Sequence, residues 1–152
     1  MAAIAPVIAR RTEKHLAQAA AKRVERWRRL AVEAAQQSRR SDVPKIYDPV
    51  SLTERVRAAS AATGESGRPA HIVLAEQERT TTLRLAVEDA VAQAGQEMPA
   101  LEIAIGPEGG WAAEEEALFD ANGWRAVSLG PRILRAETAA LAALAVVASL
   151  LE

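Results

Sequence analysis

Leu101-Glu-Ile-Ala-Ile-Gly-Pro-Glu-Gly-Gly110 places a short apolar run directly before a glycine-rich turn. An apolar run of this length, bounded by turn residues, is typical of a strand buried on both faces of a sheet. The same order recurs where a predicted strand, Trp124 to Leu129, is followed by Gly130 and Pro131. A third apolar run, His71 to Glu76, lies earlier in the chain. These runs predict the strands of a mainly parallel sheet.

Helical patterns occupy the intervals between the predicted strands. Residues 15–37 keep apolar side chains three to four positions apart, which predicts one long amphipathic helix. Ser51 and Glu54 have the spacing of a capping box, so we expect a helix from there to about Ala62. The remaining expected elements are a helix over 83–94 capped within Thr80–Thr82, helices over 112–121 and 136–151, a short strand at Ile4, Val7 and Ile8 around Pro6, and a loop over 64–69. The alternation of strands and helices indicates the α/β class.

The composition excludes several classes of protein. The chain has no cysteine, so disulfide scaffolds, thiolate metal sites and cysteine catalysis are excluded. The longest apolar run, Ala139 to Ala148, is shorter than the roughly 20 residues that span a bilayer. The first residues show no secretory signal. We therefore expect a cytoplasmic protein with no membrane association.

The charges are segregated along the chain. Up to Arg57 there are 13 Lys or Arg and 6 Asp or Glu (+7), whereas from Ala58 onward there are 6 and 14 (−8). Such a division predicts an anionic partner for the N-terminal part. One face of the 15–37 helix carries Lys22, Arg26 and Arg29, with Arg23 beside them. A face that binds RNA or DNA and a face that is merely solvated are both compatible with this stripe.

The loop from Ile105 to Gly110 follows a buried strand at the edge where α/β proteins bind ligands. Glycine lets a ligand approach the backbone closely, and Pro107 stiffens the turn. We expect the amides of 108–111 to be free to face a ligand. The spacing matches neither a P-loop nor the dinucleotide fingerprint, and a purely structural turn is the alternative.

The loop from Leu129 to Ala139 occupies the corresponding place after another strand. Arg132 and Arg135 lie three positions apart within it, and Glu137 and Thr138 are expected at the start of the last helix. A structural interpretation makes these two residues helix caps and the arginines their ion partners.

Together, Ile105-Gly-Pro-Glu-Gly-Gly110 and Leu129-Gly-Pro-Arg-Ile-Leu-Arg-Ala-Glu-Thr-Ala139 resemble the paired signatures of the RsmE family, bacterial 16S ribosomal RNA uridine N3-methyltransferases of the SPOUT class. The stretch Arg26 to Ser38 resembles a helix of the same family. The resemblance implies a SPOUT-type α/β fold, with a parallel sheet flanked by helices and a C-terminal trefoil knot. It also implies a homodimer that uses S-adenosylmethionine, needs no metal and acts on 16S rRNA or the small ribosomal subunit.

The resemblance carries site residues over by motif position. The cofactor-binding set it implies is Leu74, Ala75, Glu76, Ile105, Gly106, Pro107, Glu108, Gly109, Gly110, Leu129, Gly130, Ile133, Leu134, Arg135, Glu137, Thr138 and Ala139. For contacts with RNA we expect Arg10, Arg11, Lys22, Arg26, Arg29, Arg40 and Arg132.

The proposed chemistry needs a group that accepts the N3 proton of uridine or stabilises the charge on its oxygens. We expect Arg135 to stabilise the uracil or an adjacent phosphate, and Glu108 or Glu137 to accept the proton. His15 and His71 lie outside both loops, so we expect them to be surface or packing residues. The apolar last helix is expected in the knot core and at the dimer contact, with packing inside one subunit as the alternative.

The chain also departs from the family pattern. Residues 1–152 correspond to the SPOUT methyltransferase domain, and we expect the family's N-terminal PUA-like domain and the first helix of the methyltransferase domain to be absent. Arg39 and Gln36 replace a family glycine and glutamate. Two alternatives therefore stay open: a SPOUT methyltransferase of another RNA, such as transfer RNA, and a truncated, catalytically silent module that binds RNA or dimerises.

Overall fold

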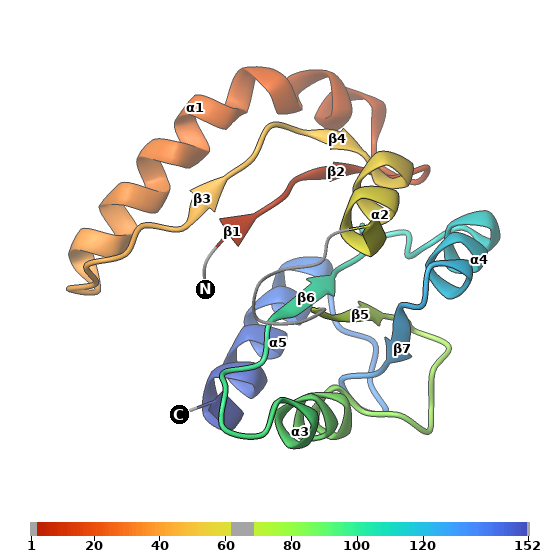
Figure 1. Ribbon diagram of the computed structural model, residues 1–152. Coiled ribbons are helices and arrows are strands. Elements are labelled where there is room, and N and C mark those ends of the chain that lie inside the picture. The colour runs from red at the N-terminus through yellow and green to blue at the C-terminus, as the bar shows by residue number, and fades with distance from the viewer. Residues whose placement is uncertain (1–2, 62–68, 152) are drawn as a thin grey trace.

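The computed structural model describes residues 3–61 and 69–151 and has the expected α/β architecture (Figure 1). A parallel sheet of three strands in the order β6-β5-β7 forms its centre. The bounds of these strands are Ala70–Leu74 for β5, Leu101–Ala104 for β6 and Arg125–Val127 for β7. All three strands end at the same edge because they are parallel, so the loops that follow them lie together.

The central strand β5 buries side chains on both of its faces, as its apolar sequence predicts. Ile72 packs with α3 (Leu83–Ala94) and α5 (Ala136–Leu151) on one face. Val73 packs on the other face with α2 (Leu52–Ala61) and α4 (Ala113–Ala121). Successive residues of a strand point to opposite faces, so β5 divides the interior into two hydrophobic clusters.

The N-terminal part forms a second parallel unit beneath α1 (Lys14–Gln37), which arches over it in Figure 1. The expected strand at Ile4 to Ile8 is divided at Pro6 into two strands, β1 and β2. Two strands that the sequence did not predict, β3 and β4, pair with them in parallel. The bounds of these four strands are Ala3–Ile4, Val7–Ile8, Lys45–Ile46 and Val50–Ser51.

The predicted caps form the expected hydrogen bonds. The amide of Glu54 donates to Ser51 Oγ at 3.2 Å, and the amide of Ser51 donates to Glu54 Oε2 at 3.1 Å. At the start of α3, the hydroxyl of Thr82 accepts from the amide of Leu85 at 3.3 Å. These local bonds explain why the beginnings of both helices were predictable.

The last helix, α5, has only one face against the core. Ala143 of α5 is fully buried against the core beside α3, and Val146 and Val147 pack in the same cluster. On the other side, Leu141 and Leu144 are exposed. Burial within one subunit therefore accounts for one side of this apolar helix.

Two expected features are not among the elements described above. The predicted loop over 64–69 falls mostly outside the described residues, and the trefoil knot stays a prediction. Within 3–61 and 69–151, no helix combines the length and the apolar character needed to cross a bilayer.

Candidate functional site

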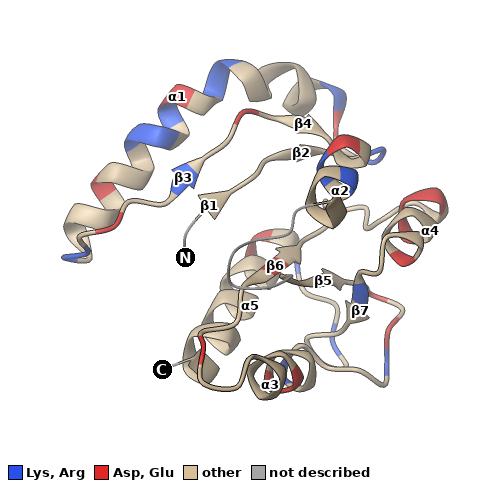
Figure 2. Ribbon diagram, in the orientation of Figure 1, with Lys and Arg blue, Asp and Glu red and all other residues tan. Residues whose placement is uncertain are grey.

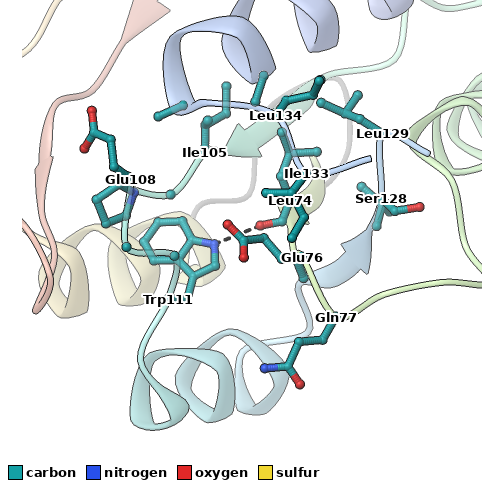
Figure 3. Close-up of a pocket in the computed structure, with 18 of the residues that line it drawn as sticks. Leu74, Glu76, Gln77, Ile105, Glu108, Trp111, Ser128, Leu129, Ile133 and Leu134 are labelled. Carbon is teal, nitrogen blue, oxygen red and sulfur yellow. Dashed lines mark hydrogen bonds between the residues drawn. The ribbon is translucent and has the colours of Figure 1, made fainter. Parts of the chain in front are cut away.

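Three loops meet around one cavity at the carboxyl ends of β5, β6 and β7 (Figure 3). The cavity volume is ≈ 130 Å³, and both glycine–proline loops line it, including Gly106 and Leu129. The sequence places both loops directly after strands, at the edge where α/β proteins bind ligands, and the structure brings them together. The site is therefore made by parts of the chain that are distant in sequence but follow neighbouring strands.

The first wall is the segment that leaves β5. Leu74, Ala75 and Glu76, which were predicted to bind the cofactor, line the cavity together with Gln77. The amide of Ala75 donates to the carbonyl of Val127 at 2.9 Å, so this wall is held against the end of β7. In Figure 3 the Glu76 carboxylate points toward the Trp111 ring.

The second wall is the turn from Ile105 to Gly110, and all six of its residues line the cavity. The amide of Gly110 donates to the carbonyl of Pro107 at 2.8 Å, and Gly110 has a φ of 66°. The expectation that the amides of 108–111 are all free was therefore wrong at Gly110, because that amide closes the turn. A residue with a side chain would be strained at this φ, which explains a glycine in this place.

An arginine from the N-terminal unit supports this second wall. Arg11 Nη1 donates to the carbonyl of Gly109 at 2.6 Å, and its methylene groups lie 3.3–3.9 Å from where a Cβ of residue 109 would be. Arg11 was expected to contact RNA, and the structure places it beside the cavity. Arg11 lines the cavity, and its bond to Gly109 joins residues that are 98 positions apart in the sequence.

The third wall runs from the end of β7 to the first turn of α5. Five residues of the predicted cofactor-binding set line the cavity here: Leu129, Gly130, Ile133, Leu134 and Ala139. Gly130 has a φ of 117°, which only glycine adopts without strain. The apolar side chains of this wall face Leu74 and Ile105 across the cavity (Figure 3).

The predicted catalytic residues are not gathered at one point. Glu108 lines the cavity, but its carboxylate is exposed and points away from the centre in Figure 3. The described residues that line the cavity do not include Arg135, Glu137 or Thr138. Ala136 and Ala139 face it instead, because residues three apart share one face of a helix. The roles assigned to Arg135 and Glu137 stay predictions.

Several residues that line the cavity were not predicted for the cofactor. The glycine-rich motif itself offered a signal only for Trp111, because this large aromatic residue follows it directly. The others depend on how the strands end and on contacts over long distances in sequence. Besides Arg11, the added residues are Gln77, Arg79, Trp111, Glu116, Val127, Ser128 and Arg132.

The cavity rim carries charges of both signs: Arg11, Arg79 and Arg132 lie near Glu76, Glu108 and Glu116. The loop that carries Arg79 is organised by Glu78. Its Oε1 accepts from the hydroxyl and the amide of Thr80, both at 2.6 Å, and from the amide of Thr81 at 2.9 Å. Led by the Thr80 hydroxyl, these bonds lower the pKa of Glu78 to about 2.

The residues expected to bind RNA occupy four places. Lys22, Arg26 and Arg29 are exposed along α1, whose basic segments are blue in Figure 2. Arg10 forms an ion pair with Glu114 at 3.2 Å. Arg40 lines an apolar groove between α1 and the strands β1 and β3. Arg11 and Arg132 belong to the cavity, so the predicted RNA contacts do not form one continuous patch.

Both histidines are placed as expected. His71 is buried on β5, where its ring stacks on Trp124 with the ring centroids 4.9 Å apart. His15 is exposed and lies 3.1 Å from Glu13.

Comparisons with known proteins agree with this architecture. A family model described as RNA methyltransferase domain matches residues 1–148. Ribosomal RNA small subunit methyltransferase E from Synechocystis is 35% identical over 141 residues, covering 93% of this chain and 43% of that protein. The protein of the same name from Mycobacterium bovis is 39% identical over 129 residues, covering 83% and 44%. The chain thus spans less than half the length of these curated relatives.

Two solved structures share the fold at 31% sequence identity. A methyltransferase from Legionella pneumophila, in complex with the bound cofactor SAM, superposes with a TM-score of 0.78 over 99% of this chain and 56% of its own. Ribosomal RNA small subunit methyltransferase E from Neisseria gonorrhoeae, bound to S-adenosyl methionine, has a TM-score of 0.74 over 99% of this chain and 55% of its own.

Proposed function

Since this chain belongs to the RNA methyltransferase domain family, we propose that it is a methyltransferase domain of the RsmE type that uses S-adenosylmethionine to methylate N3 of a uridine in 16S ribosomal RNA. The observation that carries this proposal is the convergence of the loops at Gly106 and Leu129 on one cavity. Two structural neighbours with the same fold are described as bound to this cofactor.

The chemistry of the cavity fits this cofactor. Leu74, Ile105 and Leu134 supply apolar surface for a flat aromatic base such as adenine. Gly106 and Gly110 line the cavity with backbone atoms alone, and the missing side chain at Gly106 leaves room for the Trp111 indole. The Glu76 carboxylate offers an acceptor to an amino group.

When bound, S-adenosylmethionine would supply the methyl group of its sulfonium, whose carbon–sulfur bond would break to leave a neutral thioether. Uridine N3 carries a proton that must leave as the new carbon–nitrogen bond forms. A carboxylate of the chain, Glu108 or Glu137, accepts this proton in the proposed mechanism. Arg135 stabilises the negative charge that develops on the uracil oxygens.

The same proposal includes two partners. Ribosomal RNA of the small subunit binds through exposed cations on α1, among them Lys22, Arg26 and Arg29. A second copy of the chain binds against the outer side of α5, where Leu141 and Leu144 are exposed. We assign no metal to the site.

Calorimetry with S-adenosylmethionine tests the first step of this proposal. We expect the folded chain to bind one cofactor per subunit. A folded chain that shows no binding would instead be a silent module that binds RNA or dimerises. Mapping modified nucleosides by mass in rRNA from a deletion strain tests the substrate, since loss of 3-methyluridine is expected and loss of a tRNA modification alone contradicts it.

A further inference from the structure

Trp111 lies at the junction of two walls of the cavity. It directly follows Gly109 and Gly110, lines the cavity, and has only 6% of its surface exposed. A buried tryptophan can serve the core alone, but its indole N–H requires a hydrogen-bond acceptor. The identity of that acceptor shows what the side chain connects.

The indole Nε1–H of Trp111 donates to the carbonyl of Leu74 at 2.9 Å (Figure 3). Leu74 is the last residue of β5 and begins the first wall of the cavity. Trp111 follows the turn that forms the second wall. One side-chain bond therefore ties together two walls that lie 37 positions apart in sequence.

The same ring also limits the position of Gly106. A Cβ added at Gly106 would lie 3.2 Å from Cε2 and 3.4 Å from Nε1 of Trp111. The indole thus occupies the space that a side chain at position 106 would need. On another side, the ring meets Phe119 edge-on with the centroids 4.9 Å apart. Contacts with Leu74, Gly106 and Phe119 leave the indole little freedom to move.

We infer that Trp111 is a positioning residue: its indole sets the separation between the Leu74 and Gly106 walls, and through it the affinity of the cavity for the cofactor. This inference rests on the proposed function. Both walls must contact one ligand at once, and binding sites tolerate displacements of only about 0.5 Å before affinity falls. Phenylalanine at position 111 can fill the core but cannot donate to Leu74.

The test compares Trp111→Phe with Trp124→Phe. Trp124 is a matched control, because it is also 6% exposed and also meets Phe119 edge-on, at 5.1 Å, but does not line this cavity. We expect Trp111→Phe to raise the Kd for S-adenosylmethionine roughly 3- to 10-fold, the effect of losing one hydrogen bond. Trp124→Phe should lower the thermal midpoint without changing this Kd.

A second measurement uses the wild-type chain alone and so does not depend on whether a variant folds. In a ¹⁵N-labelled wild-type chain, titration with S-adenosylmethionine should shift the indole N–H resonance of Trp111 and leave that of Trp124 in place. In methylation assays, Trp111→Phe should raise KM for the cofactor more than it lowers kcat.

The outcomes separate this inference from the proposed function. If the wild-type chain does not bind the cofactor, the proposed function fails and the positioning role fails with it. If the wild type binds, but Trp111→Phe binds equally well or Trp124→Phe weakens binding as much, only the positioning role is overturned. An indole resonance of Trp111 that does not shift at saturation with the cofactor would likewise overturn only the positioning role.

Discussion

The backbone amide of Arg10 donates to the Glu115 carboxylate at 2.7 Å, joining the end of β2 to the first turn of α4. The other oxygen of this carboxylate accepts from the amide of Ala112 at 2.9 Å. Glu115 is buried, so both amides depend on it for a partner. Because the glycine-rich turn comes just before Ala112, this one carboxylate connects the N-terminal unit to a wall of the cavity.

Replacing Glu115 by alanine should therefore destabilise the fold. Two backbone amides would lose their acceptor in a buried place, and we expect the free energy of unfolding to fall by about 1–3 kcal/mol. Urea denaturation measures this change. Glu114→Ala is the control, because it removes only the exposed ion pair with Arg10, an interaction worth less than about 1 kcal/mol. Equal losses in the two variants would contradict the buried role of Glu115.

The starts of α2 and α3 could be predicted from the sequence because their signals are local. The Ser51–Glu54 box and the Thr82 cap involve residues three positions apart, so their bonds can be anticipated without a fold. The strands β3 and β4 could not be predicted. Each has two residues, they lie among Pro44 and Pro49, and their partners are more than 40 positions away.

The candidate site was predictable only to the level of its loops. Parallel strands end at a common edge, so the turns at Gly106 and Leu129 had to approach each other once the sheet was known. The orientation of side chains was not predictable in the same way. Whether Arg135 or Ala136 faces the cavity depends on the register in which α5 begins, and Arg11 reaches Gly109 only through the tertiary fold.

Glu78 predicts a specific dependence of stability on pH. Its pKa is lowered to about 2 in the folded state from an ordinary value of 4.5, so it stabilises the fold fully above pH 4.5. This stabilisation is lost as the pH falls from 4.5 toward 2. Thermal midpoints of wild type and Glu78→Gln should therefore differ by a constant amount above pH 4.5 and converge below it. A difference that is independent of pH would exclude the carboxylate as the cause.

Arg135→Ala should separate catalysis from cofactor binding. Arg135 is exposed and is not among the described residues that line the cavity, so the Kd for S-adenosylmethionine should stay unchanged. If Arg135 stabilises charge on the uracil, turnover should fall by about 100-fold or more. Single-turnover methylation of a 16S rRNA fragment measures this step, with Arg135→Lys as the variant that retains the charge. Unchanged turnover would remove Arg135 from the mechanism.

The exposed cations of α1 should contribute to RNA affinity by binding phosphates. Reversing the charge at Lys22, Arg26 and Arg29 should weaken RNA binding and lower the slope of log K against log salt by about 1 for each phosphate that the helix no longer neutralises. Arg28→Ala is a control on the same helix, because Arg28 already pairs with Glu25 and Asp48. If affinity and slope are unaffected by the triple reversal, this face of α1 is only solvated.

The outer side of α5 predicts a dimer that one substitution can dissociate. Leu141 is 72% exposed, and Leu144, Ala145 and Ala148 follow it on the same side at helical spacing. Because apolar side chains at this spacing gain free energy when a partner covers them, we expect wild type to sediment at twice the 16.2 kDa of the chain. Leu141→Asp should shift the protein to the monomer mass, whereas Val43→Asp, at a residue that is 47% exposed and lies between α1 and β3 in the N-terminal unit, should leave the mass unchanged. A wild-type monomer, or a dimer that survives Leu141→Asp, would show that the second copy does not bind along this side of the helix.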